Sequence, residues 1–396
     1  MPGSSLPLDG VLVVDLSRAL AGPHATMMLG DLGARVVKVE APSTGDDTRG
    51  WGPPFAGPPA DSGGTPESTY FLSANRNKES VVLDLKAPGD HAVVVELIRR
   101  ADVLVENFRL GVLDRLGLGT PALFALNPRL VVLSISGFGH DGPEGGRAGY
   151  DQIAQGEAGL MSFTGPGPHE PQKVGVPIAD LLAGIHGAHG VVAALFARER
   201  TGRGSVVRTS LLASVVGVHG FQGTRWTIAR EAGLAQGNHH PSIAPYGLFA
   251  CADGAVQIAV GSESLWARFC AGFGIDPDTP GMATNPERVG CRDETIALVE
   301  KAFAAWEASP LLKRLAELGI PAGKVRTVDE VYSWDQVRSQ GLLIDVHHAS
   351  LGPLTLPGPP LRFFDDDGTE RVRQHRAPPR LGADTTAVLD WLSEAP

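Results

Sequence analysis

Residues 11–40 read VLVVDLSRALAGPHATMMLGDLGARVVKVE, and this stretch decides the fold. The continuous apolar run at 11–16 is typical of a buried parallel strand. A turn containing Gly and Pro follows, and residues 24–32 then have the apolar spacing of a helix that ends at Gly33. The second apolar run, RVVKV, occupies 35–39. A strand, a helix and a strand within about thirty residues predict a βαβ unit with parallel strands and a right-handed crossover.

Strand and helix patterns continue to alternate over the first 200 residues, which is typical of an α/β fold. We therefore expect a large α/β domain with a parallel sheet at 1–200. Its further strands are expected at 80–85, 103–105 and 130–135, and its helices at 91–100, 121–126 and 180–200. The Gly- and Pro-rich tract at 42–66 is too broken for regular structure and long for a loop, so we expect a functional flap or a wrapping segment there.

The second half of the chain has a different organisation. We expect a linker at 201–225, a smaller α+β domain at 226–330, and a linker and C-terminal segment at 331–396 that returns to the large domain. The Pro-rich stretch 352–380 is expected to be extended chain. Within the smaller domain we expect a hairpin at 247–259 that turns at Asp253 and Gly254, and helices at 264–273, 292–308 and 309–318.

Charge and cysteine usage restrict the partners of the protein. The 396 residues include 34 Lys and Arg against 44 Asp and Glu, which gives a net charge of −10 at pH 7 with no basic stripe. The three cysteines, Cys251, Cys270 and Cys291, form no CxxC pair, so neither a disulfide framework nor a thiolate zinc site is supported. No signal-peptide pattern or membrane-spanning stretch is visible. We expect a cytoplasmic protein with no nucleic-acid or membrane partner and no metal.

Several local motifs favour ordinary structural roles. GFGHDG at 137–142 matches a dinucleotide-binding pattern, but no helix pattern follows it, and the turn after 11–16 lacks the glycines that admit a pyrophosphate, so a nicotinamide site is disfavoured. The adjacent pairs His239–His240 and His347–His348 indicate solvated loop histidines rather than metal ligands. From spacing alone, Asp180 favours a role as a cap in the first turn of a helix.

Six segments occur in one order along the chain: PLDGVLVVDLSRALAGP (7–23), MMLGDLGARVVKVE (27–40), NRNKESVVLDLK (75–86), ADVLVENFRLGVLDRLGL (101–118), GYDQIAQGEAGLMSFTG (149–165) and ADLLAGIHGAHGVVAALFARERTGRG (179–204). Together they resemble the class III CoA-transferases, which include formyl-CoA transferase and share a scaffold with the α-methylacyl-CoA racemases. The resemblance covers essentially the whole chain. It implies a Rossmann-like parallel-sheet domain completed by the C-terminal segment, and a homodimer whose two chains interlock.

The resemblance also implies which residues form the site. It makes Asp180 the nucleophile and places CoA against the backbone of Leu20 and Ala21. Leu20 stands where formyl-CoA transferases have a Gln that positions oxalate, which favours a larger or more apolar acceptor. The further expected CoA contacts are Leu83, Lys86, Asn107, Phe108, Arg109, Arg115, Tyr150 and Asp151.

The implied reaction moves coenzyme A from an acyl-CoA to a small carboxylic acid through an aspartyl anhydride and an aspartyl-CoA thioester, with no permanently bound cofactor. Lys86, Arg109 and Arg115 would meet the phosphates, and backbone N–H groups near Asp180 would stabilise an oxyanion. The alternatives are a racemase or epimerase and a non-catalytic acyl-CoA binder. Tyr150 stands where racemases have a catalytic His, and tyrosine, with an ordinary pKa of about 10, is a poor base, so transfer is favoured.

Overall fold

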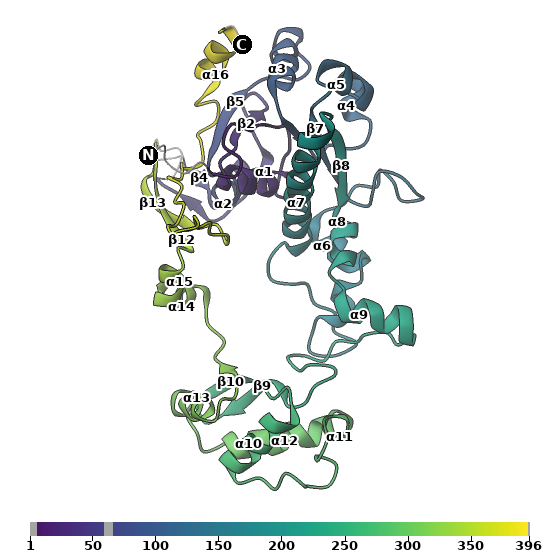
Figure 1. Cartoon of the computed structure of the whole chain (residues 1–396), viewed down its shortest axis with the longest axis vertical. Coiled ribbons are helices and arrows are strands. Elements are labelled where there is room, and N and C mark those ends of the chain that lie inside the picture. The colour runs from purple at the N-terminus through teal and green to yellow at the C-terminus, as the bar shows by residue number, and fades with distance from the viewer. Residues whose placement is uncertain (1–5, 59–65, 395–396) are drawn as a thin grey trace. The chain divides into compact units, whose positions relative to one another are not determined.

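The computed structural model describes residues 6–58 and 66–394. The chain divides into two compact units (Figure 1). Unit 1 comprises Met1–Leu160, Val174–Thr227 and Asp335–Pro396, and unit 2 comprises Met161–Lys173 and Ile228–Trp334.

A parallel sheet of six strands forms the centre of unit 1, which confirms the expected α/β fold. Its spatial order is β5-β2-β1-β6-β7-β8, so the order reverses on either side of β1. In such doubly wound sheets, ligands bind beyond the carboxyl ends of the strands at the reversal point, here β1 and β6. The strands are β1 (Leu12–Asp15), β2 (Arg35–Glu40), β5 (Lys78–Val82), β6 (Val103–Glu106), β7 (Val131–Ser136) and β8 (Ser205–Ser210).

Helices cover both faces of this sheet and enclose two apolar cores (Figure 1). One face carries α1 (Ala21–Asp31), α6 (Asp151–Glu157), α7 (Ile178–Thr201) and α8 (Leu211–Gly217). The other face carries α3 (Pro88–Arg100), α4 (Val112–Arg115), α5 (Thr120–Leu126) and α16 (Thr385–Ser393). The expected βαβ unit is present as β1, α1 and β2, with the strands in parallel register from Leu12 opposite Arg35.

Helix α7 packs unusually close to its neighbours. A Cβ on Gly184 would lie 2.8 Å from the carbonyl oxygen of Ala21 in α1, and one on Gly187 would lie 2.9 Å from Leu133 in β7. Among the described helices, α7 alone is long and apolar enough to cross a membrane, but its buried side contributes to the core between α1 and the sheet. Its opposite side leaves Ile185 and Phe196 exposed.

The segment between β2 and β5 contains only short elements in its described part. These are η1 (Asp47–Gly50), β3 (Phe55–Ala56), β4 (Glu67–Ser68) and α2 (Thr69–Ala74). Strands β3 and β4 pair antiparallel. The expected flap at 42–66 lies partly outside the described residues, since 59–65 are not described.

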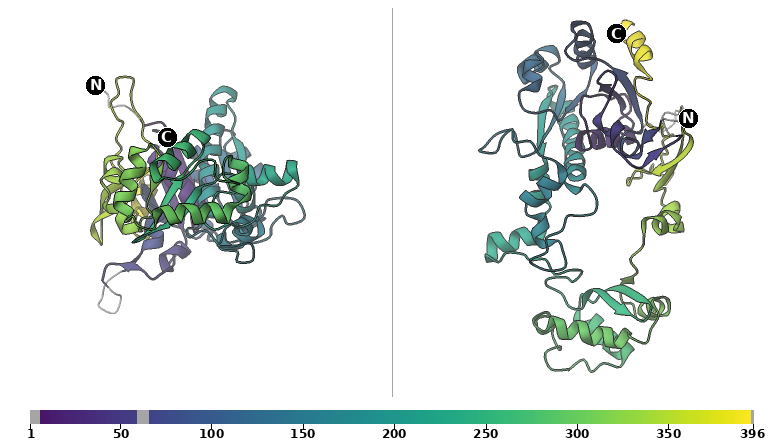
Figure 2. Two further views of the ribbon diagram at one scale, coloured as in Figure 1. Left: turned by 90° about the horizontal axis from the view of Figure 1, so that it is seen from below. Right: turned by 180° about the vertical axis from the view of Figure 1, so that it is seen from behind.

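The C-terminal segment lies along the edge strand β5 (Figure 2). The backbone N–H of Ser80 donates to Asp384, and that of Val82 donates to the hydroxyl of Thr385. The expected extended chain over 352–380 begins as strand β13 (Gly352–Pro357), and the pairing of β13 with β12 (Leu343–His348) in a hairpin was not predicted. His348 is a strand residue with 1% exposure, not a solvated loop histidine. Short helices α9 (Gly220–Thr224), η4 (Arg225–Ala229) and α15 (Asp335–Ser339) complete the connections.

Unit 2 is a small α+β body around an aromatic core. Phe249, Trp266, Phe269 and Phe303 form its centre. Strands β9 (Tyr246–Cys251) and β10 (Gly254–Ala259) form the expected hairpin, with the short β11 (Ala322–Gly323) beside it. The helices are α10 (Glu263–Phe273), α11 (Asn285–Gly290), α12 (Arg292–Phe303), α13 (Ala308–Glu317) and α14 (Val328–Ser333).

Candidate active site

The turn that leaves β1 is tied to the end of β6 at the point where the strand order reverses. The backbone N–H of Arg18 donates to Asn107 Oδ1 at 2.8 Å, and the carbonyl of Arg18 accepts from Asn107 Nδ2 at 2.8 Å. The Arg18 guanidinium lies 5.7 Å from the centre of the Phe108 ring. The structure therefore brings the turn containing Leu20 to the same sheet edge as Asn107 and Phe108.

Three expected phosphate contacts are exposed cations without protein partners. Lys86, Arg109 and Arg115 are exposed, and no side-chain hydrogen bond or ion pair joins any of them to the described residues. Their charges are therefore available to an anion from solvent. Leu83, in contrast, is 4% exposed and packs in the core, so its side chain contacts protein.

Asp180 stands in the first turn of α7, and Asp151 caps that turn. One Asp151 oxygen accepts from the backbone N–H groups of Ala179 at 2.7 Å and Asp180 at 3.3 Å. The other oxygen accepts from Gln155 at 2.7 Å. The N–H of Leu181 donates to the carbonyl of Pro177. The first-turn amides expected to stabilise an oxyanion are thus already engaged, which corrects that expectation for this conformation.

Burial and a neighbouring charge change the acidity of Asp180. Burial raises the pKa of Asp180, and the negative charge of Asp151 raises it further, to about 7. A carboxyl group with this pKa takes up and releases its proton near neutrality. As a carboxylate in a poorly hydrated place, it is also a stronger nucleophile than a solvated one.

Tyr70 and Trp51 belong to the same region, although the sequence patterns did not indicate them. Burial raises the pKa of Tyr70 to about 12, and the charges of Asp180, Asp151 and Asp46 contribute to this rise. The Tyr70 hydroxyl therefore keeps its proton and can donate a hydrogen bond. The Trp51 ring meets the Tyr70 ring edge-on with 5.0 Å between centres.

Two cavities flank Trp51. One, of about 610 Å³, is lined by Arg49, Trp51 and Tyr150 together with neighbouring residues of the segment 44–50. The other, of about 470 Å³, is lined by Trp51, Tyr70 and Ser73 among others. Tyr150 is 72% exposed and lines the first cavity directly before Asp151. These cavities give a substrate room beside the aromatic pair.

Comparison with known proteins identifies the family. The family model described as CoA-transferase family III matches residues 8–385. The chain belongs to CoA-transferase family III. It is 37% identical to human succinyl-CoA:glutarate CoA-transferase, over 97% of this chain and 85% of that protein. It is 38% identical to succinate–glutarate CoA-transferase of Agrobacterium fabrum, over 98% of this chain and 96% of that protein.

A solved structure agrees with this assignment. A CAIB/BAIF family protein from Brucella suis superposes with a TM-score of 0.85 at 37% identity, over 98% of this chain and 100% of that chain. The resemblance to class III CoA-transferases is therefore confirmed, and the protein is a CoA-transferase enzyme. Its substrates are accordingly CoA thioesters and carboxylic acids.

Over residues 6–58 and 66–394, no group of three or more His, Cys, Asp or Glu side chains is arranged to hold a metal ion. The chemistry that the site offers is that of carboxylates, a tyrosine hydroxyl and exposed cations.

Proposed function

We propose that Asp180 is the covalent nucleophile that carries CoA from an acyl-CoA donor to a carboxylic acid acceptor. The observation that carries this proposal is the environment of Asp180, which is half-buried in the first turn of α7 and has a pKa raised to about 7. Its charge also contributes to the raised pKa of Tyr70, and Tyr70 lines one of the two cavities that flank Trp51. Family membership supports the overall reaction.

The transfer proceeds in four balanced steps. A carboxylate oxygen of Asp180 attacks the donor thioester carbonyl, the C–S bond breaks, and an acyl-aspartyl anhydride and CoA thiolate result. The thiolate attacks the Asp180 carbonyl carbon, which releases the donor acid as a carboxylate and leaves an aspartyl-CoA thioester. The acceptor carboxylate then attacks this thioester and displaces the thiolate. The thiolate finally attacks the acceptor carbonyl and regenerates Asp180. Each step exchanges one activated acyl bond for another.

Tyr70 is the proposed donor to the oxyanion that forms in each step. The amides at the start of α7 are engaged by Asp151 and Pro177, so they do not supply this hydrogen bond. The Tyr70 hydroxyl stays protonated and is close enough to Asp180 for the two to influence each other electrostatically. A fixed donor in a site of restricted water is the usual means of stabilising such a charge.

The CoA molecule is proposed to lie along the carboxyl edge of β1 and β6. The backbone of Leu20 and Ala21 contacts the thioester end, and Tyr150 and Asp151 lie near it. Leu83, through its backbone, Asn107 and Phe108 contact the nucleotide end. Lys86, Arg109 and Arg115 meet the phosphates, where exposed cations without partners bind anions at little cost.

Succinyl-CoA and glutarate are the first acids to test, because the human and Agrobacterium relatives are named for them. Racemisation of an acyl-CoA is the second candidate function on this scaffold. It needs two acid–base groups across the α-carbon, and Tyr150 replaces the histidine of the racemases. Solvent deuterium entering the α-carbon of a 2-methylacyl-CoA without acceptor acid would favour racemisation.

The cytoplasm is the proposed compartment, since its reducing conditions are compatible with three free cysteines.

A homodimer of interlocked chains is the proposed assembly. Ile185, Val192 and Phe196 are exposed apolar residues spaced along one side of α7. A second copy of the chain would bury them. Phe196→Asp should shift the particle from dimer to monomer in light scattering, whereas a monomeric wild-type protein would contradict the assembly.

The decisive experiment follows CoA exchange and traps the intermediate. Wild-type protein with succinyl-CoA and labelled glutarate should yield labelled glutaryl-CoA. Hydroxylamine should modify Asp180 only when acyl-CoA is present. Asp180→Asn should abolish exchange while CoA still binds, and the exposed Asp390→Asn serves as the matched control. An Asp180→Asn enzyme that retains a tenth of the turnover would disprove the covalent role.

A further inference from the structure

A buried ion pair contacts the turn that leaves β1. Lys38 Nζ and Asp46 Oδ2 are 2.8 Å apart, and their side chains are 1% and 0% exposed. Lys38 also donates to the carbonyl of Ser17 at 2.9 Å. The second oxygen of Asp46 accepts from the backbone N–H of Ala19 at 3.2 Å and from that of Thr48 at 3.0 Å. The pair thus holds the turn at two backbone positions.

The turn needs such support because its backbone is strained. Ala19 has a φ of +62°, in the left-handed region that residues other than glycine rarely adopt. The turn is also tightly closed, since a Cβ on Gly22 would lie 2.2 Å from the Ser17 side chain. Strained backbone of this kind persists where the surroundings determine it, and it is concentrated at ligand-binding sites.

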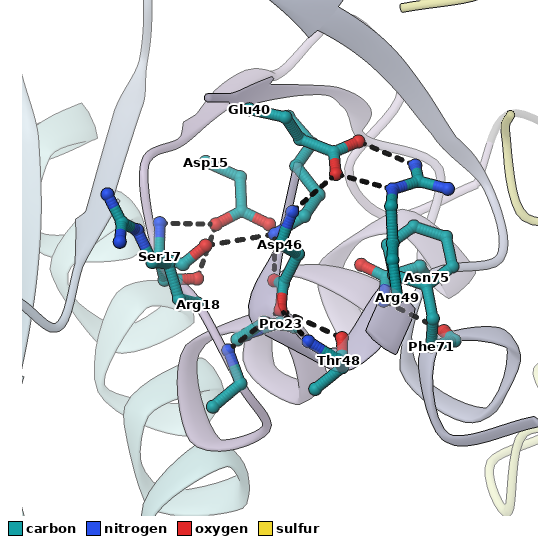
Figure 3. A network of polar contacts seen from close by, with 12 residues as sticks. Asp15, Ser17, Arg18, Pro23, Glu40, Asp46, Thr48, Arg49, Phe71 and Asn75 are labelled. Atoms are coloured by element: carbon teal, nitrogen blue, oxygen red, sulfur yellow. Dashed lines mark hydrogen bonds and ion pairs between the residues drawn. The ribbon is translucent and has the colours of Figure 1, made fainter. Parts of the chain in front are cut away.

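Asp46 also anchors the segment that leads to Trp51. Its backbone N–H donates to Glu40 Oε2 at 2.9 Å, and Glu40 binds Arg49 through two hydrogen bonds of 2.7 Å (Figure 3). The Arg49 guanidinium stacks over Phe71 at 3.7 Å. Asp46 therefore contacts the turn before α1 through its carboxylate and the Glu40–Arg49 pair through its backbone N–H, and it lines the cavity beside Trp51 together with Arg49.

The buried pair of Lys38 and Asp46 is not explained by a gain in the stability of the folded protein. Removing Lys38 and Asp46 from water costs free energy that their attraction offsets only in part, and apolar replacements of such pairs are often no less stable. The pair does fix the conformation of the backbone that it contacts. Because the pair contacts the backbone of Ser17 and Ala19, the conformation that it fixes is that of the turn after β1.

We propose that Asp46 is a positioning residue that holds Ala19 in its left-handed conformation and so presets the turn of Leu20 and Ala21 for coenzyme A. This inference rests on the proposed function, which places CoA against that turn. A turn held in the binding conformation binds its ligand without first being ordered, and the gain appears in affinity for CoA. The binding of free coenzyme A, measured without an acceptor acid, therefore reports directly on the conformation of the turn.

The variant Asp46→Asn tests the proposal, because an amide keeps the volume but has one oxygen where Asp46 uses two. We expect about tenfold weaker binding of free CoA by calorimetry and a matching rise in KM for acyl-CoA. Ala19→Gly in the Asp46→Asn background should restore most of the CoA affinity, because glycine adopts a φ of +62° without strain. Ser43, exposed with a φ of +67°, provides the matched control Ser43→Gly, which should restore nothing.

Circular dichroism and thermal melting verify that each variant is folded. If Asp46→Asn fails to fold, Lys38→Gln replaces it, with the same rescue by Ala19→Gly expected. Equal CoA affinity in folded Asp46→Asn and wild type, or equal rescue by Ala19→Gly and Ser43→Gly, would overturn the positioning role and leave the proposed function intact. A wild-type protein that does not bind CoA would overturn both.

Discussion

Asp151 caps the helix turn that carries Asp180, with one carboxylate oxygen 2.7 Å from the N–H of Ala179 and 3.3 Å from that of Asp180. The charge that stabilises the start of α7 therefore adds to the rise in the pKa of Asp180, the proposed nucleophile, that burial causes. Because the backbone N–H groups at the start of α7 already donate to Asp151 and Pro177, they do not bind a further anion, and hydrogen bonds to the substrate come from other elements.

The first prediction concerns the dependence of activity on pH. Because Asp180 attacks as a carboxylate and has a pKa of about 7, kcat/KM for acyl-CoA should rise with pH through about 7. Asp151→Asn keeps the cap but removes a charge that raises this pKa, so the midpoint should move to lower pH. Asp390→Asn should leave it in place. A midpoint unchanged in Asp151→Asn would contradict the electrostatic coupling.

The second prediction concerns stability. The pKa of Asp180 is about 7 in the folded chain against an ordinary value of 3.8, so the folded state binds this proton more tightly than the unfolded state. Ionisation of Asp180 therefore costs stability as pH rises from about 4 through 7, and no such cost exists below pH 4. Melting temperatures should show Asp180→Asn gaining on wild type between pH 4 and 8. A difference that shrinks with rising pH would refute the raised pKa.

The third prediction isolates the Tyr70 hydroxyl. Tyr70→Phe keeps the ring against Trp51 and removes the proposed donor to the oxyanion. Loss of one such donor typically lowers kcat by about 10²-fold, with little change in KM for acyl-CoA. Tyr332→Phe, in α14 of unit 2, is the matched control. Steady-state kinetics with kcat preserved in Tyr70→Phe would assign the oxyanion to another donor.

The fourth prediction concerns the exposed cations. Replacing Lys86, Arg109 or Arg115 by Ala should raise KM for acyl-CoA more than it lowers kcat, since the phosphates are bound equally before and during reaction. Arg203→Ala, an exposed arginine after α7, should have no effect. With an acyl-pantetheine that lacks the nucleotide, all these variants should behave alike. An effect that persists with acyl-pantetheine would place these side chains elsewhere than at the phosphates.

Local patterns predicted the elements whose burial is apolar. β1, α1 and β2 were predicted within a few residues because most of their buried positions are apolar, although the strands also bury Asp15, Lys38 and Glu40. Strand β5 begins two residues earlier than predicted, since Lys78 and Ser80 are buried by ion pairs and hydrogen bonds that hydropathy does not register. Strand β8 was missed because it lies at the sheet edge and alternates polar residues with Val206 and Val207.

For the site too, the sequence indicated individual residues but not the contacts between residues that are far apart in the chain. The resemblance named Asp180 and Asp151 separately, but their shared helix turn appears only when α6 and α7 pack together. Trp51 lies within the Gly- and Pro-rich tract and Tyr70 lies after it in α2, so their ring contact is a tertiary contact that local sequence patterns do not register. A polar tract that retains large aromatic residues is the signal that would have indicated them.

The missing side chain of Gly184 has a mechanical consequence. At that position the backbone of α7 nearly touches the carbonyl of Ala21, the first residue of α1. The two helices therefore have no side-chain layer between them at this contact, one turn of α7 after Asp180 and directly after Leu20. A displacement of α1 would move α7 with it, so the proposed CoA-binding turn and the proposed nucleophile would keep their positions relative to each other.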